Sequence, residues 1–170
     1  QIAVQWAKHL GARVIAVVGN DAKAELARSL GADHTIILGR EDIAARVREI
    51  TGAGAHVVYD SVGKDTFMAS LDSVRPLGML VSFGNASGPP PDINPLELSR
   101  RGSLYLTRPT LFHHTATPEQ LDETAADLFD VIASGAVKIA APTRYALADA
   151  AQSHRDLEGR KTTGSLVLVP

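Results

Sequence analysis

The sequence contains no cysteine among its 170 residues, which excludes disulfide bonds, thiolate metal ligands and cysteine nucleophiles. The absence of cysteine fits a reducing compartment, and we expect a cytoplasmic protein. No run reaches the roughly 18 apolar residues that a membrane-spanning helix needs, so no membrane association is expected. The net charge of −2 and the lack of a polybasic run argue against a nucleic-acid partner.

Familiar catalytic signatures are also missing. The sequence has no Gly-x-Ser-x-Gly elbow, and nothing in it marks a Ser–His–Asp triad. We place the pair His113-His114 on an extended segment, where adjacent side chains point to opposite faces and rarely bind one ion. The other histidines are scattered singly, so we predict no metal site and assign no catalytic residue.

A starting methionine, a signal peptide and a charged leader are all absent before Gln1. We therefore expect this chain to be a piece of a longer protein. Its 45% hydrophobic content over 170 residues is enough to bury one substantial core.

What the sequence does contain is a regular alternation of strand and helix patterns. The continuous apolar run at 13–18 is typical of a strand that is covered on both faces. Strands are expected at 13–18, 35–38, 56–60, 79–83, 103–107 and 165–169, and helices at 1–10, 21–30, 41–51, 64–74, 95–100, 118–134 and 147–158. This alternation predicts an α/β fold with a Rossmann-type, doubly wound parallel sheet.

Small and polar residues follow four of these strands, and ligands bind outside the carboxyl ends of such strands. The four strand exits are Gly19-Asn20, Leu38-Gly39, Asp60–Gly63 and Phe83–Ala86. Glycine and asparagine are also ordinary turn residues, but four such turns on one edge favour a ligand site. Ser61 is a candidate for this site. Asp60 could act as a base, although we favour a capping or turn role.

The first of these exits bears on the choice of cofactor. An NAD site usually has an acidic residue here to bind the ribose 2′-OH, whereas this chain has Gly19 and Asn20. Lys23 follows one helical turn later, where it can contact a phosphate together with helix N-terminal amides. The pattern favours NADP, although Asp21 in the same turn could restore some NAD character.

Three motifs carry a resemblance to a known family. They are Tyr59–Gly63, Val81–Asn85 and Leu106–Pro109, supported by Gln5–Lys8, Leu30–Ala32 and Ile132–Gly135. Their order and spacing resemble the C-terminal, cofactor-binding half of NADPH:quinone oxidoreductases. These form the zinc-free, zeta-crystallin-like branch of the medium-chain dehydrogenases/reductases. The similarity runs from Gln1 to Pro170.

The resemblance implies roles for particular residues. Gly19, Asn20 and Lys23 would hold the adenosine ribose and its 2′-phosphate, and Arg160 would also contact the cofactor. The turn of Phe83, Gly84, Asn85 and Ala86 would lie along the cofactor, with Thr110 and Leu111 beside the nicotinamide. Leu38 stands where the family often has a tyrosine, which removes a hydroxyl contact. From its residues alone, the basic segment at 160–164 is predicted to be a solvent-exposed turn.

The resemblance also implies which parts are lacking. The first strand, the glycine-rich loop and an N-terminal catalytic domain would all precede Gln1. Residues 1–146 would form a partial NADP-binding Rossmann domain. The helix and strand at 147–170 would pack on the N-terminal catalytic domain. We therefore expect no quinone reduction by this chain alone.

The implied activity of the whole protein is transfer of reducing equivalents from NADPH to a quinone. The alternatives are an enoyl reductase of the same superfamily, or a non-catalytic module that binds a dinucleotide or RNA or serves structurally. The charge of −2 argues against RNA. The resemblance further implies a homodimer through an edge strand at 103–107, which could instead be an internal strand.

Overall fold

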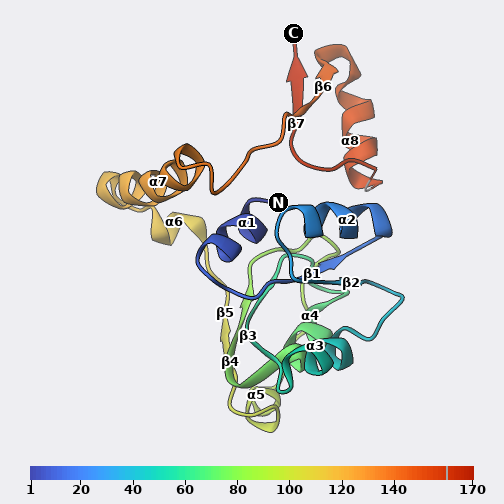
Figure 1. The fold of residues 1–170 in the computed structure, drawn as a ribbon, viewed down its shortest axis with the longest axis vertical. Coiled ribbons are helices and arrows are strands. Elements are labelled where there is room, and N and C mark those ends of the chain that lie inside the picture. Colours follow the sequence, from blue (N-terminus) through green and yellow to red (C-terminus); the bar gives the residue numbers. More distant parts are fainter. Residues whose placement is uncertain (160) are drawn as a thin grey trace. The chain divides into compact units, whose positions relative to one another are not determined.

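The computed structural model describes residues 1–159 and 161–170 and divides into two compact units (Figure 1). Unit 1 comprises residues 1–16, 20–35 and 127–170, and unit 2 comprises residues 17–19 and 36–126. No helix among the described residues is long and apolar enough to cross a membrane.

Unit 2 contains a three-stranded parallel sheet with the order β3-β4-β5. The strands are β3 (Ala55–Asp60), β4 (Val74–Ser82) and β5 (Tyr105–Thr107). The helices of this unit are α3 (Ile43–Thr51), α4 (Phe67–Ser73), α5 (Leu96–Arg100) and α6 (Leu111–His114), and α7 (Pro118–Ala133) begins here. Val81 pairs with both Tyr59 and Thr107, so the three strands end at nearly the same level.

The core of unit 2 lies between α4 and β4. Phe67 and Leu71, four residues apart on α4, share one helix face and are buried. They belong to one buried cluster with Leu80 of β4 and with Leu104. Leu71 and Leu80 are fully buried, and each such side chain contributes about 1.5–3 kcal/mol to folding. This packing fixes the position of the carboxyl end of β4.

The beginning of β4 differs from the expected strand at 79–83. The strand already begins at Val74, but its register against β3 shifts between Ala55 and Val57. Pro76 has no amide hydrogen to donate, and Leu77 has a φ of 59°. Regular pairing starts at Met79, which is the first residue of the expected strand.

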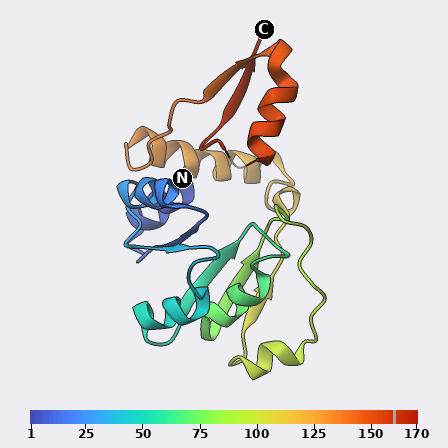
Figure 2. The same cartoon turned by 90° about the vertical axis from the view of Figure 1, so that its right-hand side faces the viewer.

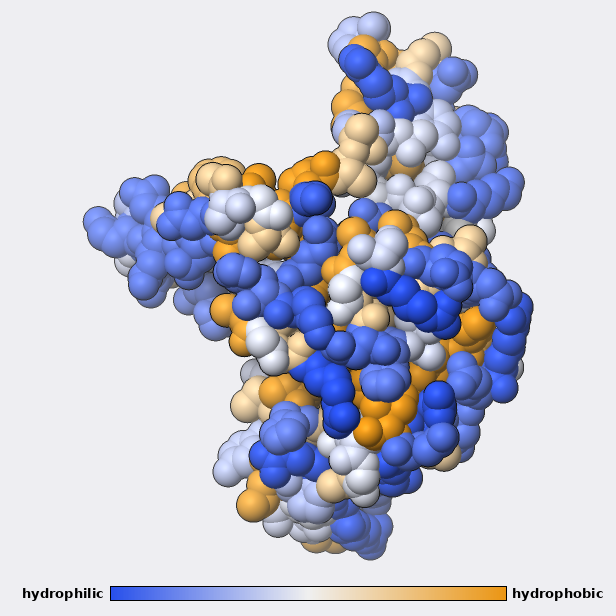
Figure 3. Space-filling model, in the orientation of Figure 1, coloured by the Kyte–Doolittle hydropathy of each residue, from blue (hydrophilic) through white to orange (hydrophobic). Residues whose placement is uncertain are grey.

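The outer edge of the sheet at β3 is exposed. Val57 and Tyr59 point into solvent, and Tyr59 is 73% exposed. Other apolar residues also lie at the surface, and Figure 3 shows these hydrophobic residues in orange. The strand β5 lies at the opposite edge, as expected, rather than inside the sheet.

Unit 1 contains α1 (Ile2–His9), α2 (Asp21–Ser29) and the C-terminal elements. The side chain of Gln5 connects α1 to Lys138. Its Nε2 donates to the Lys138 carbonyl oxygen at 3.1 Å, and its Oε1 accepts from the Lys138 amide at 3.0 Å. Lys8 also pairs with Asp33 at 2.5 Å.

The C-terminal elements form a small parallel pair of strands, β6 (Thr143–Ala146) and β7 (Leu166–Val169). A 3₁₀ turn (Leu147–Asp149) leads into α8 (Ala150–Glu158), which lies beside these strands (Figure 2). Tyr145 of β6 donates a hydrogen bond to Asp156 of α8 at 3.1 Å.

The remaining strands, β1 (Ile15–Val18) and β2 (His34–Ile37), form a two-stranded sheet. In unit 1, the amides of Asp33 and His34 donate to the carbonyl oxygen of Val14, and in unit 2, Leu38 donates to Val18. These strands and α2 match the expected strand–helix–strand pattern, and the predicted α/β class with parallel strands is confirmed.

One local expectation was wrong, and one strand was not predicted at all. The pair His113-His114 lies in the short helix α6, not on an extended segment. A helix of four residues is too short to show a helical period in the sequence. The strand β6 was not expected, because its four residues follow Pro142 without a distinct apolar run.

Candidate functional site

The carboxyl ends of β3 and β4 hold two turns side by side. Asp60 and Ser82 are register partners, and three backbone hydrogen bonds connect the turns beyond them. Phe83 donates to the Asp60 carbonyl at 2.8 Å, Ala86 to the Ser61 carbonyl at 3.2 Å, and Ser87 to the Val62 carbonyl at 2.8 Å. The structure therefore brings together Ser61 and the turn Phe83–Ala86, as expected for strand exits on one edge of a sheet. The other two predicted exits follow β1 and β2, which pair in a two-stranded sheet of their own.

Two glycines make this close approach possible. A Cβ on Gly84 would lie 2.7 Å from the Ser61 Cα and closer still to the Ser61 carbonyl oxygen. A Cβ on Gly63 would collide with the carbonyl oxygen of Gly88, and Gly63 also has a φ of +87°. Both glycines are thus required by the backbone packing of the two turns.

Asp60 organises the first turn from its buried position. One carboxylate oxygen accepts from the amides of Val62 (2.8 Å) and Gly63 (3.0 Å), and the hydroxyls of Thr66 (2.8 Å) and Ser70 (2.6 Å) donate to the other. Burial raises the pKa of this carboxyl, but the hydrogen bonds from Ser70, Gly63, Thr66 and Val62 outweigh it and hold the pKa below its usual value. The predicted turn role of Asp60 is confirmed.

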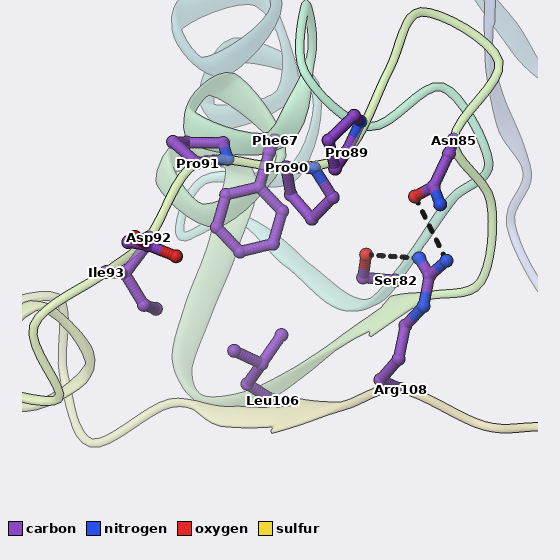
Figure 4. Close-up of a pocket in the computed structure, with 10 residues that line it drawn as sticks. All are labelled: Phe67, Ser82, Asn85, Pro89, Pro90, Pro91, Asp92, Ile93, Leu106 and Arg108. Atoms are coloured by element: carbon purple, nitrogen blue, oxygen red, sulfur yellow. Dashed lines mark hydrogen bonds between the residues drawn. The ribbon is translucent and has the colours of Figure 1, made fainter.

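Arg108 follows β5 and reaches back to the turn after β4. Its Nη1 donates to the Ser82 hydroxyl and to the Gly84 carbonyl, both at 3.1 Å. Its Nη2 donates to Oδ1 of Asn85 at 3.0 Å. The guanidinium thereby ties the end of β5 to the end of β4 (Figure 4).

A pocket of about 420 Å³ lies beside this arginine. Figure 4 shows Arg108, Ser82 and Asn85 grouped on one side of the pocket and the proline run 89–91 across from Leu106. The pocket therefore joins an apolar wall to a group of hydrogen-bonding side chains.

The exit of β1 has a different construction. Gly19 has no positive φ, and a Cβ there would meet nothing within 4 Å. Asn20 is the N-cap of α2, and its Oδ1 accepts from the Lys23 amide at 2.9 Å. Lys23 itself lies in the first turn of α2. Among residues 1–159 and 161–170, neither packing nor backbone conformation explains why residue 19 is a glycine.

The other predicted residues lie on exposed segments. Phe83 is half exposed, and Leu111, at the start of α6, is exposed. Thr110 is the N-cap residue of α6 without a side-chain capping bond. Leu38 follows β2 directly.

The predicted cofactor residues are divided between the two units. Asn20 and Lys23 belong to unit 1, whereas Ser61, Phe83–Ala86, Thr110 and Leu111 belong to unit 2. Arg160 lies outside the described residues.

Arg108 is the site residue that the sequence reasoning missed. In the sequence, Arg108 belongs to the family motif Leu106–Pro109, and the four strand exits predicted to form the site end at Ala86. The segment Thr107–Pro109 is also a strand exit, and the same rule applied to β5 would have selected its arginine.

Comparison with known proteins matches residues 1–130 to the family described as "Zinc-binding dehydrogenase". The quinone oxidoreductase of Pseudomonas aeruginosa is 53% identical over 99% of this chain and 52% of its own length. A 2-haloacrylate reductase from a Burkholderia species is 47% identical over 99% of this chain and 51% of its own length. This chain spans about half the length of the curated relatives it matches.

A solved structure gives the same picture in three dimensions. The Escherichia coli quinone oxidoreductase complexed with NADPH superimposes with a TM-score of 0.94 at 46% sequence identity. The match covers 99% of this chain and 53% of that one.

The zinc in the family description finds no matching ligands here. The chain has no cysteine, and within residues 1–159 and 161–170 no group of three or more His, Asp or Glu side chains is placed to hold a metal ion. The described residues do not fit a zinc site, and no chemical step is assigned to zinc.

Proposed function

Because this chain belongs to the zinc-binding dehydrogenase family, we propose that it is the cofactor-binding part of an NADPH-dependent quinone oxidoreductase. When bound, NADPH supplies the hydride that reduces the acceptor. The residues of this chain would hold and orient the cofactor, and the rest of the protein would complete the substrate cleft.

The observation that carries this proposal is the construction of the exit of β1. A side chain on Gly19 would meet no atom of the described residues within 4 Å, and this open space suits close approach of a ligand to the backbone. Lys23 stands in the first turn of α2, where helix N-terminal amides and a cation together favour a phosphate. Gly19 and Asn20 carry no carboxylate, and Asp21 follows them as the first residue of α2. Attraction of a ribose 2′-phosphate would therefore come from Lys23 and the amides at the start of the helix.

The turns of unit 2 would hold the remainder of the cofactor. Ser61 and the turn Phe83–Ala86 offer backbone and neutral polar groups at the ends of β3 and β4. Thr110 and Leu111 would lie beside the nicotinamide, and Arg160 would add a further contact to the cofactor. These assignments rest on the family resemblance and on the grouping of the two turns.

The test of this proposal is a fluorescence titration of the complete protein with NADPH and with NADH. Replacing Lys23 by Ala should raise the Kd for NADPH about tenfold to a hundredfold, because a hydrogen bond to a charged group contributes about 1.5–3 kcal/mol. The Kd for NADH should hardly change. Lys138→Ala, which removes an exposed lysine elsewhere, is the matched control. Equal binding of both cofactors, unaffected by Lys23→Ala, would refute the 2′-phosphate assignment.

A second substitution tests the open space at Gly19. Gly19→Ala should leave the free energy of unfolding unchanged or raise it by up to about 1 kcal/mol, because no atom in the described part of the chain lies within 4 Å of the added methyl group. It should nevertheless weaken NADPH binding, which calorimetric titration would measure. Unchanged affinity would mean that no ligand approaches residue 19.

A second class of compound is also a candidate for the hydride acceptor. The 47% identity to a 2-haloacrylate reductase favours reduction of an electron-poor carbon–carbon double bond, a feature that quinones share. Turnover of the complete protein with a benzoquinone and with 2-chloroacrylate, each with NADPH, would distinguish the two acceptors.

We also propose a homodimer through residues 103–107. The position of β5 at the edge of its sheet supports this arrangement, because an edge strand presents unpaired backbone groups to a second copy.

A further inference from the structure

We propose that Arg108 is a positioning residue: it orients the amide of Asn85, so that the turn after β4 offers the cofactor a hydrogen-bond donor. This inference rests on the proposed function, because it assumes that the turn contacts NADPH. It assigns a task to a side chain that has no role in the cofactor contacts proposed above.

The first observation in support is the set of hydrogen-bond acceptors that Arg108 contacts. Its guanidinium donates to three oxygens, on Ser82, Gly84 and Asn85, at 3.0–3.1 Å. All three acceptors are uncharged, and the described part of the chain forms no ion pair with this arginine. The planar fork of a guanidinium can serve several acceptors in a fixed geometry, which an ammonium group cannot do. The arrangement therefore depends on shape more than on charge.

The second support is the effect on Asn85. An asparagine amide has one acceptor oxygen and one nitrogen with two donor hydrogens. Because Arg108 can only donate, it must face the oxygen of Asn85. A flipped amide would place two donors against each other and lose a charge-assisted hydrogen bond. The nitrogen Nδ2 is thus the group that remains for a ligand, and no residue among 1–159 and 161–170 accepts from it.

The chemical consequence is a defined polarity for this contact. A donor at Asn85 recognises an oxygen acceptor, such as a carbonyl, hydroxyl or phosphate oxygen of the dinucleotide. Arg108 also immediately precedes the segment Pro109–Leu111 (Figure 4 shows its attachment to the opposite turn). The same side chain thereby connects two of the segments of unit 2 that are proposed to contact the cofactor.

A double-mutant cycle on the complete protein tests whether Arg108 acts through Asn85. The Kd for NADPH is measured by fluorescence for the unsubstituted protein, Arg108→Gln, Asn85→Ala and the double variant. We expect Asn85→Ala to raise the Kd about tenfold and Arg108→Gln about fivefold to tenfold. In the Asn85→Ala background, Arg108→Gln should change the Kd less than twofold, since its target is gone.

Two further variants separate geometry from charge and from folding. Arg108→Lys, carried through the same cycle, should behave like Arg108→Gln, because lysine keeps the charge but cannot serve three acceptors. Arg100→Gln, on the exposed helix α5, removes one positive charge elsewhere and should leave the Kd unchanged. Urea unfolding midpoints check that each variant is folded.

The outcomes are distinct. Additive effects of the two substitutions, or full NADPH affinity in Arg108→Lys, would overturn the positioning role and leave the proposed function standing. Absence of NADPH binding by the unsubstituted protein would overturn both. Non-additive losses that Arg108→Lys reproduces would establish Arg108 as the residue that orients Asn85.

Discussion

Replacing Gly84 by Ala should lower the free energy of unfolding by about 3 kcal/mol, as measured by urea denaturation. The added methyl group would lie 2.7 Å from the Cα of Ser61 and closer still to its carbonyl oxygen. Both atoms belong to the backbone, so no side-chain rotation can relieve the overlap. The turns after β3 and β4 would have to separate, which would break hydrogen bonds such as that from Ala86 to Ser61.

Gly19→Ala is the matched control for this experiment. Gly19 directly follows β1, Gly84 lies two residues after the end of β4, and neither has a positive φ. Only Gly84 faces another backbone segment, whereas Gly19 faces open space. If the two substitutions changed the unfolding free energy equally, the close approach of the two turns would be wrong.

The other large effect is expected at Asp60. Replacing Asp60 by Ala should reduce the free energy of unfolding by about 3–5 kcal/mol, because it leaves the hydroxyls of Thr66 and Ser70 and two backbone amides without their acceptor. Asp130→Ala, on the exposed face of α7, should change it by less than about 0.5 kcal/mol. Equal unfolding midpoints for the two variants would contradict the role given to Asp60.

The same carboxylate should make stability depend on pH. The hydrogen bonds hold its pKa in the folded protein below the ordinary value of 3.8 for an aspartate, so its contribution to stability is complete above that value and is lost as the pH falls through the folded pKa. Asp60→Asn keeps the shape and removes the titration. Urea unfolding at pH 7, 5 and 3 should show the stability difference between native protein and variant constant from pH 7 to 5 and smaller at pH 3.

The strand–helix alternation could be predicted because each element carries its own local pattern. The pair Phe67 and Leu71 shows the four-residue spacing of a buried helix face, and both residues are buried. The apolar run at 13–18 predicted a strand correctly, but its expected burial on both faces is not seen, because none of these residues is buried and Val17 is 43% exposed. Where local patterns are short, prediction failed. The four residues of α6 and the four of β6 are defined by their context, since β6 exists through pairing with β7, some twenty residues later.

The candidate site also has features that could be predicted from the sequence and features that could not. Glycines and polar residues at strand ends were visible in the sequence, and the grouping of Ser61 with Phe83–Ala86 followed from parallel strands of matching register. The three contacts of Arg108 were not predictable, because they depend on how far β5 extends beside β4. The sequence shows the order in which the strand exits occur along the chain. It does not show which side chain after one strand contacts the turn after the neighbouring strand.

The edge position of β3 has a consequence for any experiment on the 170 residues alone. β3 lies at one edge of its three-stranded sheet, and an edge strand can add a further strand. Its side chains Val57 and Tyr59 are exposed, whereas parallel sheets are usually covered on both faces. The 170 residues alone would present an apolar surface that the complete protein is expected to cover, so measurements of self-association and ligand binding should be made on the complete protein.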